Sequence, residues 1–100
     1  MTGLLEETSP GHFTLKGELT FATVVGVWKD SQPRLARATG KVVIDLRQVS
    51  RADSAALGLL VEWLRLGARK GVSLSFRHLP PDLATMASAY HLESLLPVDG

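Results

Sequence analysis

The residues with the clearest chemical potential are Asp53 and Ser54, which follow a short loop and precede an apolar run over residues 55–60. A serine hydroxyl at the start of a helix can accept hydrogen bonds from unpaired N–H groups of the first turn, as an N-cap does. The same N–H groups and the helix dipole favour negative charge, so a phosphate on Ser54 would be tolerated, although Asp53 would repel it. Ser54 is therefore interpreted as an N-cap, a phosphate acceptor or a contact point for a partner.

Catalysis by Ser54 would need a base within hydrogen-bond reach. The three histidines are scattered along the chain, and none lies in a nucleophile motif: His12, His78 and His91. The sequence ADSAA lacks the G-x-S-x-G nucleophile elbow. Asp45 at the end of a strand and Asp53 in a capping loop could be imagined as an acid/base pair, but aspartates in such positions usually have structural roles. The histidines lack metal-ligand spacing, and no phosphate-loop or dinucleotide fingerprint is present. The sequence predicts a non-enzyme without catalytic residues, metal or cofactor.

Length and composition narrow the class of protein further. The 100 residues carry a net charge of +1 and no cysteine, so we expect one small domain over residues 1–100 without disulfides and without a basic surface for nucleic acid. The first residues have no basic or apolar signal region, and no apolar run approaches the ~18 residues that a membrane span needs. We therefore expect a cytoplasmic domain that does not insert into a membrane.

Apolar periodicity in the first half predicts a hairpin and a helix. Residues 4–7 and 13–17 have the composition and alternation of two strands around the turn signal at residues 9–11. Apolar residues then recur at helical spacing and predict one apolar helix face: Phe21, Val24, Val25 and Trp28. Pro33 is expected to end this helix and to open a second short turn, because proline removes a hydrogen bond within a helix.

The second half alternates between strands and helices. Residues 42–46 form a nearly continuous apolar run, as in a central strand covered on both faces. A helix is expected from Ser54 to about Lys70, where Gly71 stops it, followed by a strand at residues 72–76 and a helix at residues 82–90. The predicted order is β-β-α-β-α-β-α, an α/β fold with a mixed, mostly parallel sheet of about four strands and packed helices.

The long helix carries two apolar stripes at ~100° per residue. The first is expected to face the sheet and contains Leu57, Leu60, Val61, Leu64 and Ala68. The second lies roughly opposite and contains Leu59, Trp63 and Leu66. The second stripe either packs on a neighbouring helix of the same chain or docks another protein, since exposed apolar patches mark interfaces.

The run VVIDLRQVSRADSAALGLLVEWLRLGARKG resembles the signature of the STAS domain, in which an apolar strand ends in Asp-Leu before a loop, Asp-Ser or Asp-Thr, and a Leu-rich helix. The resemblance is closest to the MlaB-type STAS subunits of phospholipid-transport ABC complexes. The similar features are GEL at residues 17–19, Trp28, DL-x-x-V-x-R at residues 45–51, a hydroxyl residue after Asp53 and YHL at residues 90–92. Ala56 departs from the family, because many relatives have glycine there.

The resemblance implies a non-catalytic cytoplasmic subunit that reaches the inner membrane only through its partner, the ATPase of an ABC transporter that maintains lipid asymmetry. The alternative is an anti-sigma factor antagonist that a serine kinase phosphorylates at Ser54. In either case, the implied partner-binding or phospho-acceptor residues are Ser54, Asp53, Ala55, Trp28 and Tyr90. Homodimerisation, the identity of the lipid and the direction of transport stay open.

Overall fold

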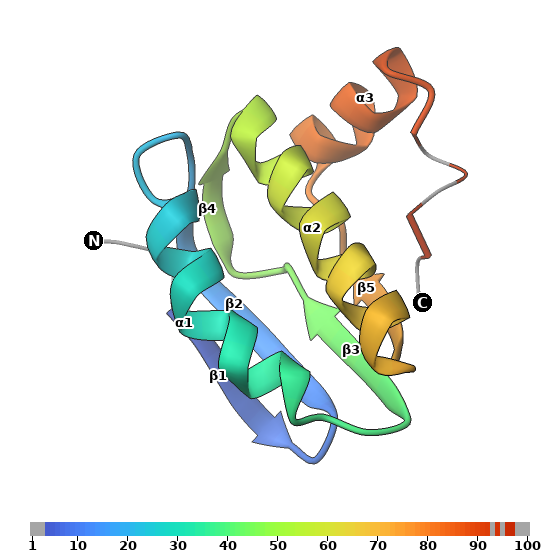
Figure 1. Ribbon diagram of the computed structural model, residues 1–100. Coiled ribbons are helices and arrows are strands. Elements are labelled where there is room, and N and C mark those ends of the chain that lie inside the picture. Colours follow the sequence, from blue (N-terminus) through green and yellow to red (C-terminus); the bar gives the residue numbers. More distant parts are fainter. Residues whose placement is uncertain (1–3, 93, 95, 98–100) are drawn as a thin grey trace.

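The computed structural model of the protein describes residues 4–92, 94, 96 and 97. Eight elements follow one another along the chain (Figure 1): β1 (Leu4–Ser9), β2 (His12–Leu19), α1 (Val24–Ala36), β3 (Lys41–Asp45), β4 (Val49–Ala52), α2 (Ser54–Lys70), β5 (Ser73–Arg77) and α3 (Pro81–Ala89). The predicted hairpin, the long helix and the last strand and helix are all present.

The strands form one mixed sheet in the order β1-β2-β3-β5, with β4 pairing to β2. β1 runs antiparallel to β2, whereas β2 with β3 and β3 with β5 are parallel pairs. Parallel neighbours need crossover connections, and α1 and α2 supply them. The predicted α/β class with a mostly parallel mixed sheet is confirmed.

The sheet has five strands where about four were expected, because residues 49–52 form β4 instead of a loop. β4 pairs in parallel with the second half of β2, with Gly17 opposite Val49 and Leu19 opposite Ala52. β3 pairs with the first half of β2, so β4 extends the sheet where β3 ends. Ser50 and Arg51 are both exposed, which removes the apolar alternation that identifies a strand in a sequence.

The prediction that Pro33 ends the first helix is wrong, because α1 continues through it to Ala36. Lys29 and Pro33 are both exposed. The Lys29 carbonyl, which would have accepted the missing N–H, therefore lies on the hydrated side of the helix, where water can replace the lost hydrogen bond. Leu35 beyond the proline is 3% exposed, and its burial favours continuing the helix by one turn.

The core lies between the sheet and the helices, with α2 placed between α1 and α3 (Figure 1). The strands contribute the larger part of it: Leu5, Phe13, Leu15, Leu19, Val42, Ile44, Leu46, Leu74 and Phe76. On β3 the expected burial on both sides is confirmed, since Val42, Val43 and Ile44 are all buried. The long helix ends as predicted at Gly71, whose φ of 70° is the left-handed conformation that glycine adopts freely.

Candidate partner-binding site

The start of α2 is built around the Asp53 carboxylate. Its Oδ1 accepts the Ala55 N–H at 2.9 Å, and its Oδ2 accepts the Phe21 N–H at 3.0 Å. The Asp53 N–H in turn donates to the Leu19 carbonyl at 3.2 Å. One side chain therefore caps α2 and holds the loop that leads from β2 into α1 against the start of α2.

Asp53 is the N-cap of α2, so the interpretation of Ser54 as the cap is wrong. Ser54 is the first residue of the helix and is exposed. Within the described part of the chain its hydroxyl makes no hydrogen bond. The hydroxyl is therefore accessible to a partner or a kinase, and its own contribution to folding is small.

This geometry predicts opposite outcomes for two neighbouring alanine substitutions. Asp53→Ala should lower the free energy of unfolding by about 1–2 kcal/mol, because it removes the cap and the anchor of Phe21. Ser54→Ala should stay within about 0.5 kcal/mol of wild type, as is usual for exposed positions. Urea unfolding of both variants checks this, and a larger loss in Ser54→Ala would restore Ser54 as the cap.

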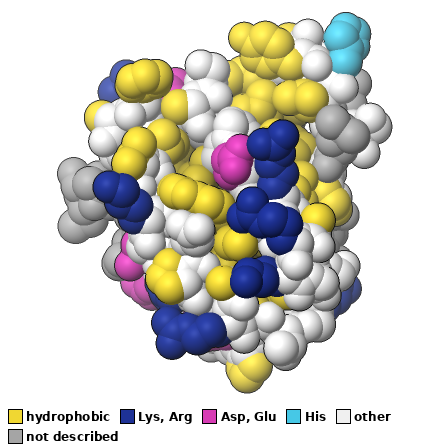
Figure 2. Space-filling model, in the orientation of Figure 1, with side chains coloured by type: hydrophobic (Ala, Val, Ile, Leu, Met, Phe, Trp, Pro, Cys, Tyr) yellow, Lys and Arg dark blue, Asp and Glu magenta, His cyan; other side chains and the backbone are white. Residues whose placement is uncertain are grey.

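Beside this helix start lies a hollow of about 400 Å³ between the first halves of α1 and α2. Its lining is apolar except for one carboxylate and consists of Val24, Val25, Trp28, Ala55, Gly58, Leu59 and Glu62. Figure 2 shows hydrophobic side chains gathered on this face, over α1 and the border with α2. The structure thus brings together three residues with predicted partner contacts: Trp28 and Ala55 in the lining, and Ser54 one helical turn before Gly58 on α2.

Two large apolar side chains near the start of α1 are more exposed than the sequence indicated. Phe21 is 85% exposed and Val25 is 60% exposed. Both were expected on one apolar face of the first helix, but the buried face of α1 is formed by Val27, Ser31 and Leu35. Phe21 precedes α1 altogether. An apolar residue beside a helix start carries no signal of exposure, so this part of the site could not be found from periodicity.

Tyr90 does not belong to this group of residues. It is 61% exposed and follows the last turn of α3, and α2 lies between α3 and α1 (Figure 1). The implied contact of Tyr90 with a partner therefore stays a prediction for a separate part of the surface. A partner that touched both the hollow and Tyr90 would have to reach across α2.

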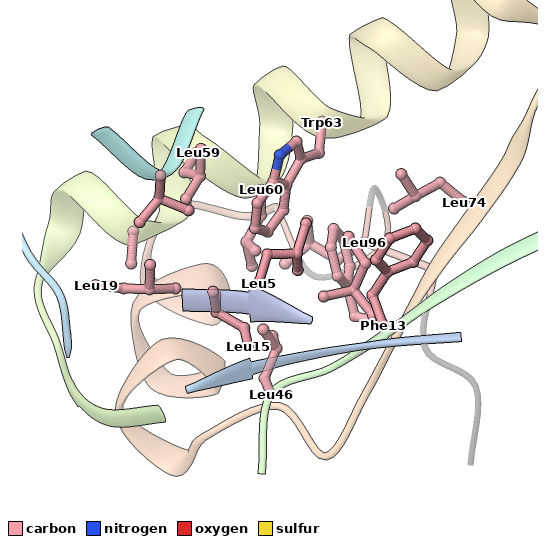
Figure 3. Packing of buried hydrophobic residues seen from close by; sticks show 14 of the residues in the cluster. Leu5, Phe13, Leu15, Leu19, Leu46, Leu59, Leu60, Trp63, Leu74 and Leu96 are labelled. Carbon is pink, nitrogen blue, oxygen red and sulfur yellow. The ribbon is translucent and has the colours of Figure 1, made fainter. Parts of the chain in front are cut away.

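The second apolar stripe of α2 is part of the core, so the interpretation of Trp63 as a docking residue is wrong. Trp63 is 0% exposed, and its Nε1 donates to the Ser31 Oγ of α1 at 2.8 Å. Figure 3 shows Leu59, Leu60 and Trp63 pointing from α2 toward the strands. Contact with a neighbouring helix of the same chain is the interpretation that the structure confirms.

The predicted sheet-facing stripe is correct only in part. Leu57 and Leu60 are buried, but Val61 and Leu64 are half-buried and Ala68 is exposed. The buried face of α2 is wider and turned toward α1, because α2 packs on that helix as well as on the sheet. A single amphipathic stripe describes only a helix that packs on one surface.

A second cluster of polar residues lies where β3 and β5 end. The His78 Nδ1 is 3.1 Å from the Asp45 Oδ1, and the Arg47 Nη2 is 2.7 Å from the His78 Nε2. The Arg47 N–H also donates to the Asp45 Oδ1 at 2.8 Å. Because guanidinium only donates, Nε2 accepts from Arg47 and Nδ1–H donates to Asp45. The sequence gives no signal that connects these residues, since 31 positions separate Arg47 from His78.

Burial by itself raises the pKa of the Asp45 carboxyl, but the hydrogen bonds from Arg47 N–H and His78, with the nearby positive charge, hold this pKa below its ordinary value of 3.8. A carboxyl whose pKa is lowered by folding stabilises the folded state at pH values above its ordinary pKa. This stabilisation is lost as the pH falls below the ordinary pKa and the carboxyl becomes protonated. Wild type should therefore be more stable than Asp45→Asn near neutral pH. The difference should shrink as the pH falls through 3.8, and urea unfolding across this range measures it. A constant difference would contradict the assignment.

Asp45 and Asp53 do not form an acid/base pair. The Asp45 carboxylate accepts hydrogen bonds from His78 and from the Arg47 N–H, whereas the Asp53 carboxylate accepts hydrogen bonds from backbone N–H groups. In the described ranges, no three histidine or acidic side chains are placed to hold a metal ion. The described helices include none with the length and apolar character needed to cross a membrane. Within the described residues, a hollow with a mainly apolar lining lies beside Ser54.

The mixed sheet, its crossover helices and the exposed serine at the start of α2 place the protein in the class of STAS-type α/β domains. A family model described as "Mlab, STAS domain" matches residues 4–97. The chain therefore belongs to the MlaB-type STAS family, whose domains generally bind and regulate other proteins. No curated protein sequence matches the chain significantly.

Solved structures with low sequence identity share the fold. The unphosphorylated anti-sigma factor antagonist SpoIIAA has a TM-score of 0.71 at 16% identity, with 99% of this chain and 88% of that chain covered. A candidate anti-sigma factor antagonist from Thermotoga maritima has a TM-score of 0.79 at 18% identity, with 98% of this chain and 86% of that chain covered. The murine anion transporter Slc26a9 gives 0.63 at 13% identity, where 83% of this chain matches 14% of the transporter. At these identities the likeness concerns the fold alone.

Proposed function

We propose that the protein is a non-catalytic subunit that binds and supports the ATPase of an ABC phospholipid-transport complex. The observation that carries the proposal is the accessible Ser54 beside the apolar hollow at the start of α1 and α2. A partner seated there would cover Val25, an apolar side chain of the hollow that is 60% exposed in the isolated domain. The match to the MlaB-type family model supports an ABC transporter as the source of that partner.

The mode of action follows from binding energy. A subunit that binds one conformation of the ATPase more tightly than another shifts the population toward the first, and a factor of ten in affinity is worth about 1.4 kcal/mol. This requires a contact surface and no chemistry within the domain. The protein would reside in the cytoplasm and reach the inner membrane through this partner.

Affinity purification from native membranes tests the proposal. The tagged chain should recover an ABC ATPase together with its permease, and the recovered ATPase should lose activity when the subunit is removed. Recovery of a serine kinase without any ABC ATPase would contradict the proposal. Genes for a permease and a lipid-binding periplasmic protein next to the gene for this chain would add independent support.

A second candidate function is that of an anti-sigma factor antagonist switched by phosphorylation. The accessible Ser54 hydroxyl favours it, because a kinase needs an exposed acceptor with no competing hydrogen bond. Phosphate there would add about −1.5 to −2 charges next to Asp53 and would change the surface that a partner meets. Intact-mass measurement with site mapping on protein from its own cells distinguishes the two functions, since only the switch requires phosphoserine at Ser54.

A further inference from the structure

The border between α1 and α2 carries a second hollow beyond the apolar one. It measures about 430 Å³ and is lined by Gln32, Pro33, Ala36, Leu66, Arg69 and Lys70. The apolar hollow is formed by the first halves of the two helices and this one by their last halves. The two hollows follow one another along the border between the helices, here named the α1–α2 seam, which is apolar at one end and basic at the other.

The charged residues that line the second hollow, Arg69 and Lys70, are both basic. Lys29, Arg65, Arg69 and Lys70 are exposed on these two helices, and Figure 2 shows Lys and Arg side chains in a column over α2, beside the hydrophobic area. The one carboxylate in either lining, Glu62, already pairs with Arg65 at 3.3 Å. Within the described residues no carboxylate pairs with Lys29, Arg69 or Lys70.

Glycine allows a close approach at the apolar end. A Cβ built on Gly58 would meet no atom within 4 Å, so this position opens onto free space. Gly58 and Ala55 lie one turn apart on α2 and both line the apolar hollow. A partner helix could therefore approach α2 closely there and pack its side chains against Val25 and Trp28.

We infer that the α1–α2 seam binds an amphipathic helix of the partner, with apolar side chains in the hollow beside Gly58 and carboxylates facing Arg69 and Lys70. The inference rests on the proposed function in taking the partner to be the transporter ATPase. Helix-in-groove recognition uses apolar side chains at helical spacing. Leu59 and Arg69 are about 15 Å apart along α2 at 1.5 Å per residue, so the acidic residues of the partner helix should lie about ten positions from its apolar ones, on either side according to the direction of that helix.

Crosslinking from the full chain in native membranes tests the inference. Val25, an exposed residue of the apolar hollow, is replaced by p-benzoylphenylalanine, and Lys16, an exposed residue of β2 that lines neither hollow, carries the same replacement as a control. The probe at position 25 should crosslink a helical segment with apolar and acidic residues, and the probe at position 16 should not. Crosslinks from position 25 to a basic segment, to lipid or to a second copy of this chain would overturn the inference.

Two matched glycine variants measure the contribution of the hollow. Gly58→Leu should reduce ATPase recovery at least tenfold, whereas Gly26→Leu should leave it unchanged, because Gly26 is also open but does not line the hollow. ATPase recovery that is equal with both variants would overturn the inference and leave the proposed function intact. An acidic amphipathic helix crosslinked from another class of protein would keep the inference and overturn the proposed function.

Discussion

Trp63→Ala is expected to lower the free energy of unfolding by about 3–5 kcal/mol, the usual cost of truncating a buried tryptophan. Trp63 is 0% exposed, and its ring lies 6.4 Å from that of Phe76. Its Nε1 also provides the hydrogen bond to Ser31 that joins α2 to α1. The total free energy of unfolding of a protein domain is only about 5–15 kcal/mol. The variant should therefore lose much of its stability, which urea unfolding would measure.

Two further variants separate packing from hydrogen bonding. Trp63→Phe keeps an aromatic ring in the core and should cost less than alanine, while Ser31 retains its hydrogen bond to the Trp28 carbonyl at 3.1 Å. Trp28→Ala should cost less than Trp63→Ala, because Trp28 is only half-buried. A stable Trp63→Ala protein that failed to bind its partner would show instead that this tryptophan is a docking residue.

Ser54→Glu is expected to weaken binding to the ATPase by about tenfold to a hundredfold, or about 1.4–2.8 kcal/mol. The added carboxylate would have to be desolvated at the edge of the interface, next to Asp53. Its effect on folding should be small, because Ser54 is exposed and negative charge is favoured in the first turn of a helix. Titration of the purified ATPase with both proteins, alongside urea unfolding, measures the two effects separately.

Ser9→Glu is the matched control for this prediction. Ser9 is also an exposed serine, but it ends β1 and lines neither of the two hollows between α1 and α2. The same change in charge there should leave ATPase binding within about twofold of wild type. If Ser54→Glu bound as tightly as Ser9→Glu, the start of α2 would not belong to the interface.

Residue periodicity and turn residues determined much of this fold. The alternation of Phe13 and Leu15 marks β2, and Gly71 marks the end of α2, because these signals depend on a few neighbouring residues. The DL…DS signature also identifies the family and marks Ser54 as a candidate contact residue. Local patterns of this kind are reliable where one face of an element packs on one surface.

Only the tertiary structure decided the remaining features, because each depends on contacts between distant parts of the chain. β4 exists through pairing with β2, and α1 continues past Pro33 because Leu35 is buried in the core. Asp53 replaces Ser54 as the cap because its second oxygen also accepts the Phe21 N–H, 32 positions away. Trp63 became a core residue and Phe21 a surface residue for the same reason: neighbours brought together by folding determine burial, and apolar character alone does not.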